Sequence, residues 1–129
     1  MASMKKVDEL EKLSQKYYGY VADLEGSRIE ILDLLFVRDR IQGILEQMKP
    51  DEPIPQPLYE RIHTLDALLC QARHTFLMVI GQKELEYARA QQKSPRSHWW
   101  WYLDELKTPL EHDVLWGCEA SLGEGFAQA

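Results

Sequence analysis

Apolar residues recur every three or four positions through most of this chain, the spacing expected of one buried face of an α-helix. One such stripe runs through residues 13–48, and a second runs through residues 58–80. Residues 29–37 are apolar on nearly every side and are short enough to form a strand. They lack the alternation of a half-buried strand, however, and the helical spacing continues beyond them. The pattern therefore predicts an all-α protein.

The N-terminal stripe can be read as two helices or as one. Gly26 can end a first helix over residues 4–25, and Ser27 with Glu30 forms the S-x-x-E capping box that begins a second helix over residues 27–48. The alternative is one continuous helix, because the apolar spacing can be carried through Ser27. We favour a break at Gly26. Residues 1–3 read as an expression-vector remnant and are left out of the predicted fold.

A proline-rich turn over residues 49–57 separates the two halves, because its four prolines lack the amide hydrogen that a helix needs. Pro57 can occupy the first turn of the following helix. That helix is predicted over residues 58–91 as a single element, with Gly81 as its weakest point.

Two short helices are predicted near the C-terminus. The first covers residues 98–107. The second covers residues 109–116, since Thr108 and Glu111 form another capping box with Pro109 at the first helical position. Residues 117–129, which contain three glycines, are predicted to be a loose tail after a single all-helical domain over residues 4–116.

Two or three long helices of this kind form a helical hairpin or bundle, and each carries more apolar surface than one neighbour can cover. A four-helix-type core formed by homodimerisation would bury that surface. The alternative is a monomer with a three-helix core, on which the two short C-terminal helices form a lid.

Composition and charge argue against two classes of protein, those that bind nucleic acid in general and those that span a membrane. The net charge of −6 opposes general nucleic-acid binding, which needs a basic surface. Neither a signal peptide nor a run of about 20 apolar residues is present, so no membrane span is predicted. The two cysteines are not in a CxxC pair, which fits a protein with reduced thiols in the cytoplasm.

The most unusual segment reads Trp-Trp-Trp-Tyr at residues 99–102. On an α-helix, consecutive residues step by about 100°, so these rings point all around the axis. They either complete the core or contact another protein, because tryptophan, tyrosine and arginine are common at protein interfaces. The predicted partner-binding residues are Trp99, Trp100, Trp101 and Tyr102, with Arg96 and His98 at the rim.

No catalytic arrangement of residues is evident, and we predict neither enzyme activity nor a cofactor. The runner-up hypothesis is a helical bundle that binds a metal, haem or a small apolar ligand near His63, Cys70 and His74. Histidine and thiolate are suitable ligands, but the span from His63 to Cys70 is about 10 Å of helix, too long for one metal ion. The sequence therefore predicts a non-catalytic interaction module, that is, an adaptor, assembly factor or regulatory subunit that binds itself and another protein.

Overall fold

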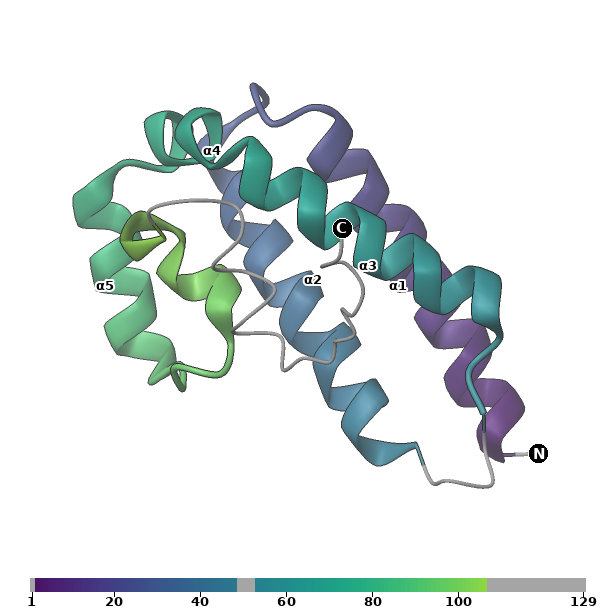
Figure 1. The fold of residues 1–129 in the computed structure, drawn as a ribbon. Coiled ribbons are helices and arrows are strands. Elements are labelled where there is room, and N and C mark those ends of the chain that lie inside the picture. The colour runs from purple at the N-terminus through teal and green to yellow at the C-terminus, as the bar shows by residue number, and fades with distance from the viewer. Residues whose placement is uncertain (1, 49–52, 107–129) are drawn as a thin grey trace, which may run out of the picture.

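A computed structural model describes residues 2–48 and 53–106 of the chain, and every regular element in these ranges is helical (Figure 1). The elements are α1 (Ala2–Ala22), α2 (Arg28–Gln47), α3 (Gln56–Gln71), α4 (Arg73–Ile80), α5 (Gln82–Gln92) and the 3-10 helix η1 (Trp99–Glu105). The all-α prediction is confirmed. Among the described helices, none is long and apolar enough to cross a bilayer. The predictions for residues 109–116 and 117–129 fall outside the described residues.

The break near Gly26 and the capping box that follows it are both present. The Ser27 hydroxyl accepts a hydrogen bond from the Glu30 amide at 3.1 Å, and the Ser27 amide donates to the Glu30 carboxylate at 3.3 Å. These two bonds satisfy amide groups that a helix start leaves unpaired. The chain therefore turns back after α1, and α2 runs antiparallel to it (Figure 1).

The second stripe forms three helices, so the prediction of one helix over residues 58–91 is wrong. Pro57 does occupy the first turn of α3, as predicted. The helix then breaks at Ala72, and again at Gly81, whose φ of 85° is a left-handed value that favours glycine. At the first break the buried side chain of Arg73 donates to the carbonyl groups of Cys70 and Leu106. The bond to Leu106 is a tertiary contact, and it occurs where the chain leaves the continuous helix that local propensity favours.

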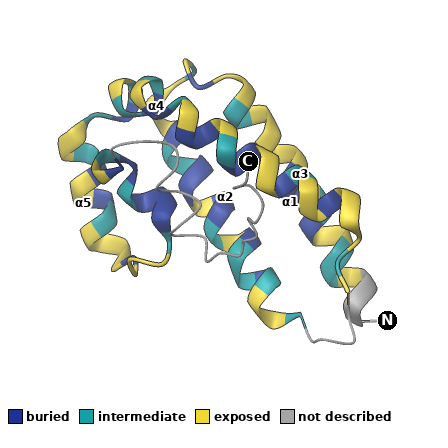
Figure 2. Cartoon of the chain, in the orientation of Figure 1, coloured by how far each residue is buried: buried dark blue, intermediate teal, exposed yellow. Residues whose placement is uncertain are grey.

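The helices enclose a shared core. α1 packs against both α2 and α3, while η1 contacts α2, α4 and α5 (Figure 1). Figure 2 shows buried positions on the inward faces of the helices and exposed positions on their outer faces. The largest fully buried apolar side chains include Trp99, Trp100, Trp101, Tyr17 and Phe76. The tryptophan segment is therefore part of the core of a single chain.

Candidate binding groove

The tryptophan segment forms a 3-10 helix instead of the predicted α-helix. Its backbone departs from helical geometry at Tyr102, where φ is −123° and ψ is 31°. Neighbouring helices on several sides enclose it, and Trp99, Trp100 and Trp101 are 2%, 1% and 0% exposed. Of the two alternatives predicted for this segment, completion of the core describes these three indoles.

Asp39 on α2 holds two of the indoles in place. Its carboxylate accepts hydrogen bonds from Trp100 Nε1 at 2.8 Å and from Trp101 Nε1 at 3.0 Å. The same carboxylate lies 3.2 Å from Nδ1 of His98, whose ring stacks on Trp100 with a centroid separation of 4.7 Å. A buried indole N–H needs a partner, and one aspartate supplies it for both rings.

A buried ion pair lies beneath the same rings. The Arg38 guanidinium donates two hydrogen bonds to the Asp66 carboxylate, at 2.9 and 2.8 Å, and both side chains are fully buried. Tyr17 donates a third at 2.6 Å. The guanidinium carbon of Arg38 lies 4.3 Å from the Trp100 ring centroid, within the range of a cation–π contact. This network joins α1, α2, α3 and η1.

The electrostatics of this network depend on burial and on the Asp66 carboxylate. Burial raises the pKa of Tyr17 well above its usual value, and the adjacent Asp66 charge raises it further. For Arg38, burial alone would lower the pKa. The charge and hydrogen bonds of Asp66 outweigh that effect, so the pKa of Arg38 is raised. Both groups therefore remain protonated at neutral pH, and neither is poised for proton transfer.

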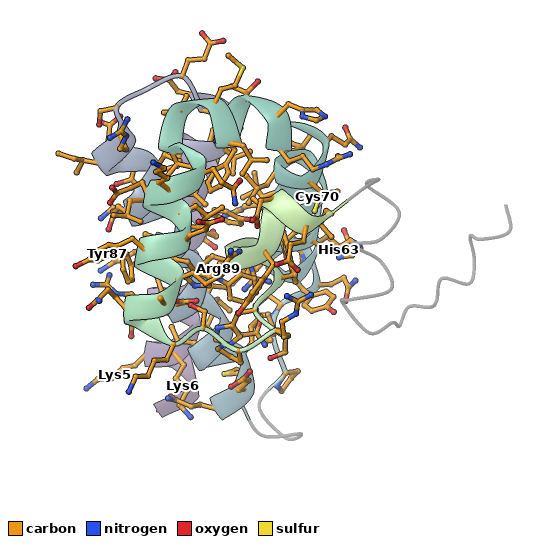
Figure 3. The ribbon with its side chains drawn as sticks, turned by 90° about the vertical axis from the view of Figure 1, so that its left-hand side faces the viewer. Lys5, Lys6, His63, Cys70, Tyr87 and Arg89 are labelled. Carbon is orange, nitrogen blue, oxygen red and sulfur yellow. The ribbon has the colours of Figure 1, made fainter. Side chains whose placement is uncertain are left out.

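Arg89 joins α5 to η1. It donates to the Asp104 carboxylate at 2.8 Å and to the Trp101 carbonyl at 2.9 Å. Tyr102 lies between two cations, with the guanidinium carbons of Arg89 and Arg96 at 4.7 and 4.5 Å from its ring centroid. Figure 3 shows Arg89 pointing inward from α5, whereas Tyr87 on the same helix points outward.

The Arg89–Asp104 pair makes a testable pH prediction. Burial would raise the pKa of Asp104, but hydrogen bonds from Arg89 and Gln82 outweigh it, so the pKa is lowered. A lowered folded-state pKa stabilises the fold above the unfolded value of about 3.9, and this contribution is lost as the pH falls through the lower folded value. We expect Asp104→Asn to lower the free energy of unfolding by about 1–2 kcal/mol at pH 7.

The difference between wild type and Asp104→Asn should shrink towards zero between about pH 4 and pH 2, as measured by urea unfolding. The matched control is Glu105→Gln, which removes the charge of a more exposed pair with Arg96 and should change stability by less than about 1 kcal/mol. A difference for Asp104→Asn that is constant with pH would contradict the prediction.

A groove of about 370 Å³ opens beside the tryptophan segment. It lies between α2, α3, the start of η1 and the chain just before α3, and its lining residues are Gln42, Leu45, Ile54, Tyr59, Ser97, Trp99 and Trp100. Its volume is near the lower end of the ~300–1,000 Å³ range typical of ligand pockets. Five of the seven described lining residues are aliphatic or aromatic, the polar groups are the Gln42 amide and the hydroxyls of Ser97 and Tyr59, and none of the seven carries a charge. Such a lining suits an apolar side chain or two from a peptide segment.

The groove includes only part of the predicted contact set. Trp99 and Trp100 line it, whereas Trp101 is wholly buried against Asp39, and Tyr102 is held by Arg89 and Arg96. The predicted rim residues Arg96 and His98 instead contact Glu105 and Asp39.

The sequence pattern does not predict five of the groove residues, which are Gln42, Leu45, Ile54, Tyr59 and Ser97. They come from segments far apart in the chain, and no local spacing identifies them as a set. Leu45 falls within the apolar stripe of residues 13–48, and in the structure it is only half-buried.

His63, Cys70 and His74 do not form a ligand cluster. Cys70 is buried on α3, whereas His63 on α3 and His74 on α4 are exposed. Figure 3 labels His63 and Cys70. Over residues 2–48 and 53–106, no group of three or more histidine, cysteine, aspartate or glutamate side chains could hold a metal ion.

No protein-family model, curated protein or solved structure shows significant similarity to this chain. The groove is therefore interpreted from its own geometry.

Proposed function

We propose that this protein is a non-catalytic helical interaction module that binds an apolar segment of another protein in the groove beside the tryptophans. One observation carries the proposal: the rings of Tyr59, Trp99 and Trp100 line the groove, and the two indoles are held in place before any ligand arrives. Trp100 is fixed by Asp39 and by the cation of Arg38, and Trp99 packs edge-on against it at 5.5 Å. Preorganised aromatic rings bind with little loss of side-chain entropy.

The chemistry of the lining favours a peptide over a reactive substrate. Gln42 and Ser97 can hydrogen-bond a peptide backbone, while Leu45, Ile54 and Tyr59 offer apolar contact. Catalysis would require a nucleophile with a base or a pair of acids facing a cleft, and no charged side chain is among the described residues that line the groove. An adaptor, assembly factor or regulatory subunit in the cytoplasm would use a site of this kind.

The test compares two leucine-to-arginine variants. Leu45→Arg places a charge at the groove and should weaken partner binding at least tenfold, because a buried unpaired charge is costly at an interface. Leu68→Arg is the matched control, since Leu68 is 45% exposed on α3. It lies nine residues after Tyr59, which is about 180° around the helix from the groove. It should bind like wild type.

Binding would be measured by photocrosslinking in a native lysate followed by titration of the identified partner. Equal binding by Leu45→Arg and wild type would contradict the proposal. Homodimerisation is the alternative way to cover exposed apolar side chains such as Ile29, Met78 and Tyr87. Light scattering on the same samples gives the oligomeric state, and a stable dimer disrupted by Leu45→Arg would show that a second copy occupies the groove.

A further inference from the structure

We propose that the outer face of α2 is a contact between two copies of this chain, in which the two α2 helices pack antiparallel. Three residues of α2, Ile29, Phe36 and Gly43, are spaced seven apart. This spacing keeps them within about 20° of one line along the helix, as in the seam of a coiled coil. They are termed the outer stripe below. The inference goes beyond the proposed function, because the groove takes no part in the contact.

The outer stripe is open in a single chain. Ile29 is 81% exposed and Phe36 is 36% exposed. The Cβ that another residue would have at Gly43 meets no neighbouring helix within 4 Å. The buried residues of α2 lie on its opposite side, since Leu34 and Arg38 are each about 160° from Phe36 around the helix axis. The helix therefore presents an apolar seam to solvent, away from the core.

The shape of the outer stripe is complementary to itself. In an antiparallel pair with a two-fold axis at Phe36, a residue before Phe36 lies level with the residue equally far after it in the second copy. Ile29 and Gly43 are each seven residues from Phe36. The most exposed side chain of the stripe therefore lies over the position that has no side chain, and glycine permits that close approach. Phe36 meets its own copy at the centre.

Both flanks of the stripe carry opposite charges at matching levels, and the two-fold axis brings like flanks together. On the flank towards α1, Asp33 and Arg40 are three residues before and four after Phe36, so Arg40 comes within about 1.5 Å, along the axis, of the level of Asp33 in the second copy. On the other flank, Arg28 and Glu46 are eight before and ten after, a difference of about 3 Å. The symmetry repeats each ion pair.

These charged side chains are accessible to a second copy. Arg28, Arg40 and Glu46 are exposed. Asp33 accepts from Tyr20 and lies 3.5 Å from Lys16, but its side chain is 42% exposed and can accept from another cation. A parallel pair would instead place Arg40 beside Arg40 and leave a gap between the two Gly43 positions, and both features disfavour that arrangement. The charges therefore favour the antiparallel pair.

The groove lies on the other side of α2 from the outer stripe. Leu45, which lines the groove, is nine residues after Phe36 and therefore about 180° around the helix from it. The dimer leaves a groove open in each copy. Such an assembly would bind a partner that carries two apolar segments with greater avidity than a single chain does.

Disulfide crosslinking of the full chain tests the register. The Ile29→Cys/Gly43→Cys variant, in a Cys118→Ser background, should form a covalent dimer under mild oxidation. Helix axes about 8–10 Å apart bring facing Cα atoms to about 4–6 Å, which suits a disulfide. Ile29→Cys or Gly43→Cys alone should give no covalent dimer, because the thiols of the two copies would be about 20 Å apart. Crosslinking by Ile29→Cys alone would show a parallel pair and overturn the proposal.

Sedimentation equilibrium over a concentration series measures the strength of the contact. Ile29→Glu should weaken dimerisation at least tenfold, because an apolar contact is lost twice in the symmetric pair. It should remain folded by circular dichroism, since an acid suits the first turn of a helix. The matched control is Met78→Glu on α4, where Met78 is 84% exposed but lies outside the stripe. It should dimerise like wild type, and equal weakening by both variants would overturn the proposed register.

Charge reversal provides a rescue that a purely structural role would not show. Arg28→Glu and Glu46→Arg each place like charges across the contact and should weaken dimerisation about fivefold. The combined variant Arg28→Glu/Glu46→Arg should return to within about twofold of wild type. An acid at the start of α2 and a base at its end both suit the helix dipole, so the fold is retained. Failure of the combined variant to recover would overturn the ion pairs and the register with them.

The outcomes separate this inference from the proposed function. A wild-type chain that stays monomeric up to about 1 mM, where even weak complexes form, would overturn the dimer and leave the groove proposal intact. Leu45→Arg should leave dimerisation unchanged, and its loss in that variant would place the second copy in the groove instead. Partner binding insensitive to Leu45→Arg, with the expected crosslinking, would overturn the proposed function but keep the α2 contact.

Discussion

Replacing Asp66 with alanine is expected to lower the free energy of unfolding by about 3–5 kcal/mol, the effect of removing one partner from a buried ion pair. The guanidinium of Arg38 is fully buried and makes two of its hydrogen bonds to Asp66. Without the carboxylate, Arg38 retains its charge away from water, and the Tyr17 hydroxyl also loses its acceptor. A loss of this size is a large fraction of the 5–15 kcal/mol that typically stabilises a domain.

Urea unfolding followed by circular dichroism measures the loss, and a triple variant tests its cause. Tyr17→Phe/Arg38→Met/Asp66→Leu removes the two charges and the hydroxyl together. Because the cost of Asp66→Ala arises from an unpaired charge, the triple variant should be within about 1–2 kcal/mol of wild type or more stable. If Asp66→Ala cost less than 1 kcal/mol, water would have to reach Arg38, and the buried network described here would be wrong.

The sequence predicted the helix starts better than the helix breaks. Ser27 with Glu30 and Pro57 carry their signals in local chemistry, and both act as expected. Ala72 carries none, because alanine favours a continued helix. The break there coincides with a hydrogen bond from Arg73 to the Leu106 carbonyl, 33 residues away. A contact of that range has no signature in a local window.

The sequence does carry a signal for the buried ion pair. Arg38 occupies a position in the apolar stripe of α2, where a charge requires a buried partner. Asp66 follows Leu65 directly in the stripe of α3 and is equally buried. A charged residue of each sign at core positions of two neighbouring helices predicts such a pair, although the sequence does not indicate which helices pack together.

The tryptophan segment shows the limit of reasoning from helix geometry. The even distribution of four rings around an axis correctly indicates that several neighbours are needed to cover them. It does not reveal that η1 is a 3-10 helix kinked at Tyr102, or that α2, α4 and α5 of the same chain supply those neighbours. The groove is what this packing leaves open, so it depends on tertiary structure that the sequence pattern does not specify.

Replacing Asp39 with alanine is the second large effect, with an expected loss of about 2–4 kcal/mol, because it leaves the buried N–H groups of two indoles without their acceptor. Asp39→Asn keeps one acceptor oxygen and should lose less. The matched control is Asp33→Ala on the same helix. Asp33 is more exposed and accepts from Tyr20 at 2.7 Å, so its removal should cost less than about 1 kcal/mol.

Urea unfolding measures the stability of these variants, and acrylamide quenching measures access to the indoles. Asp39→Ala should increase quenching and shift tryptophan emission to longer wavelength, because Trp100 is no longer fixed against α2. Since Trp100 also lines the groove, the same variant should weaken partner binding under conditions where it remains folded, while Asp33→Ala should not. Unchanged quenching in a destabilised Asp39→Ala variant would show that packing alone holds the indoles, and the preorganisation on which the groove's affinity depends would then lie elsewhere than in this carboxylate.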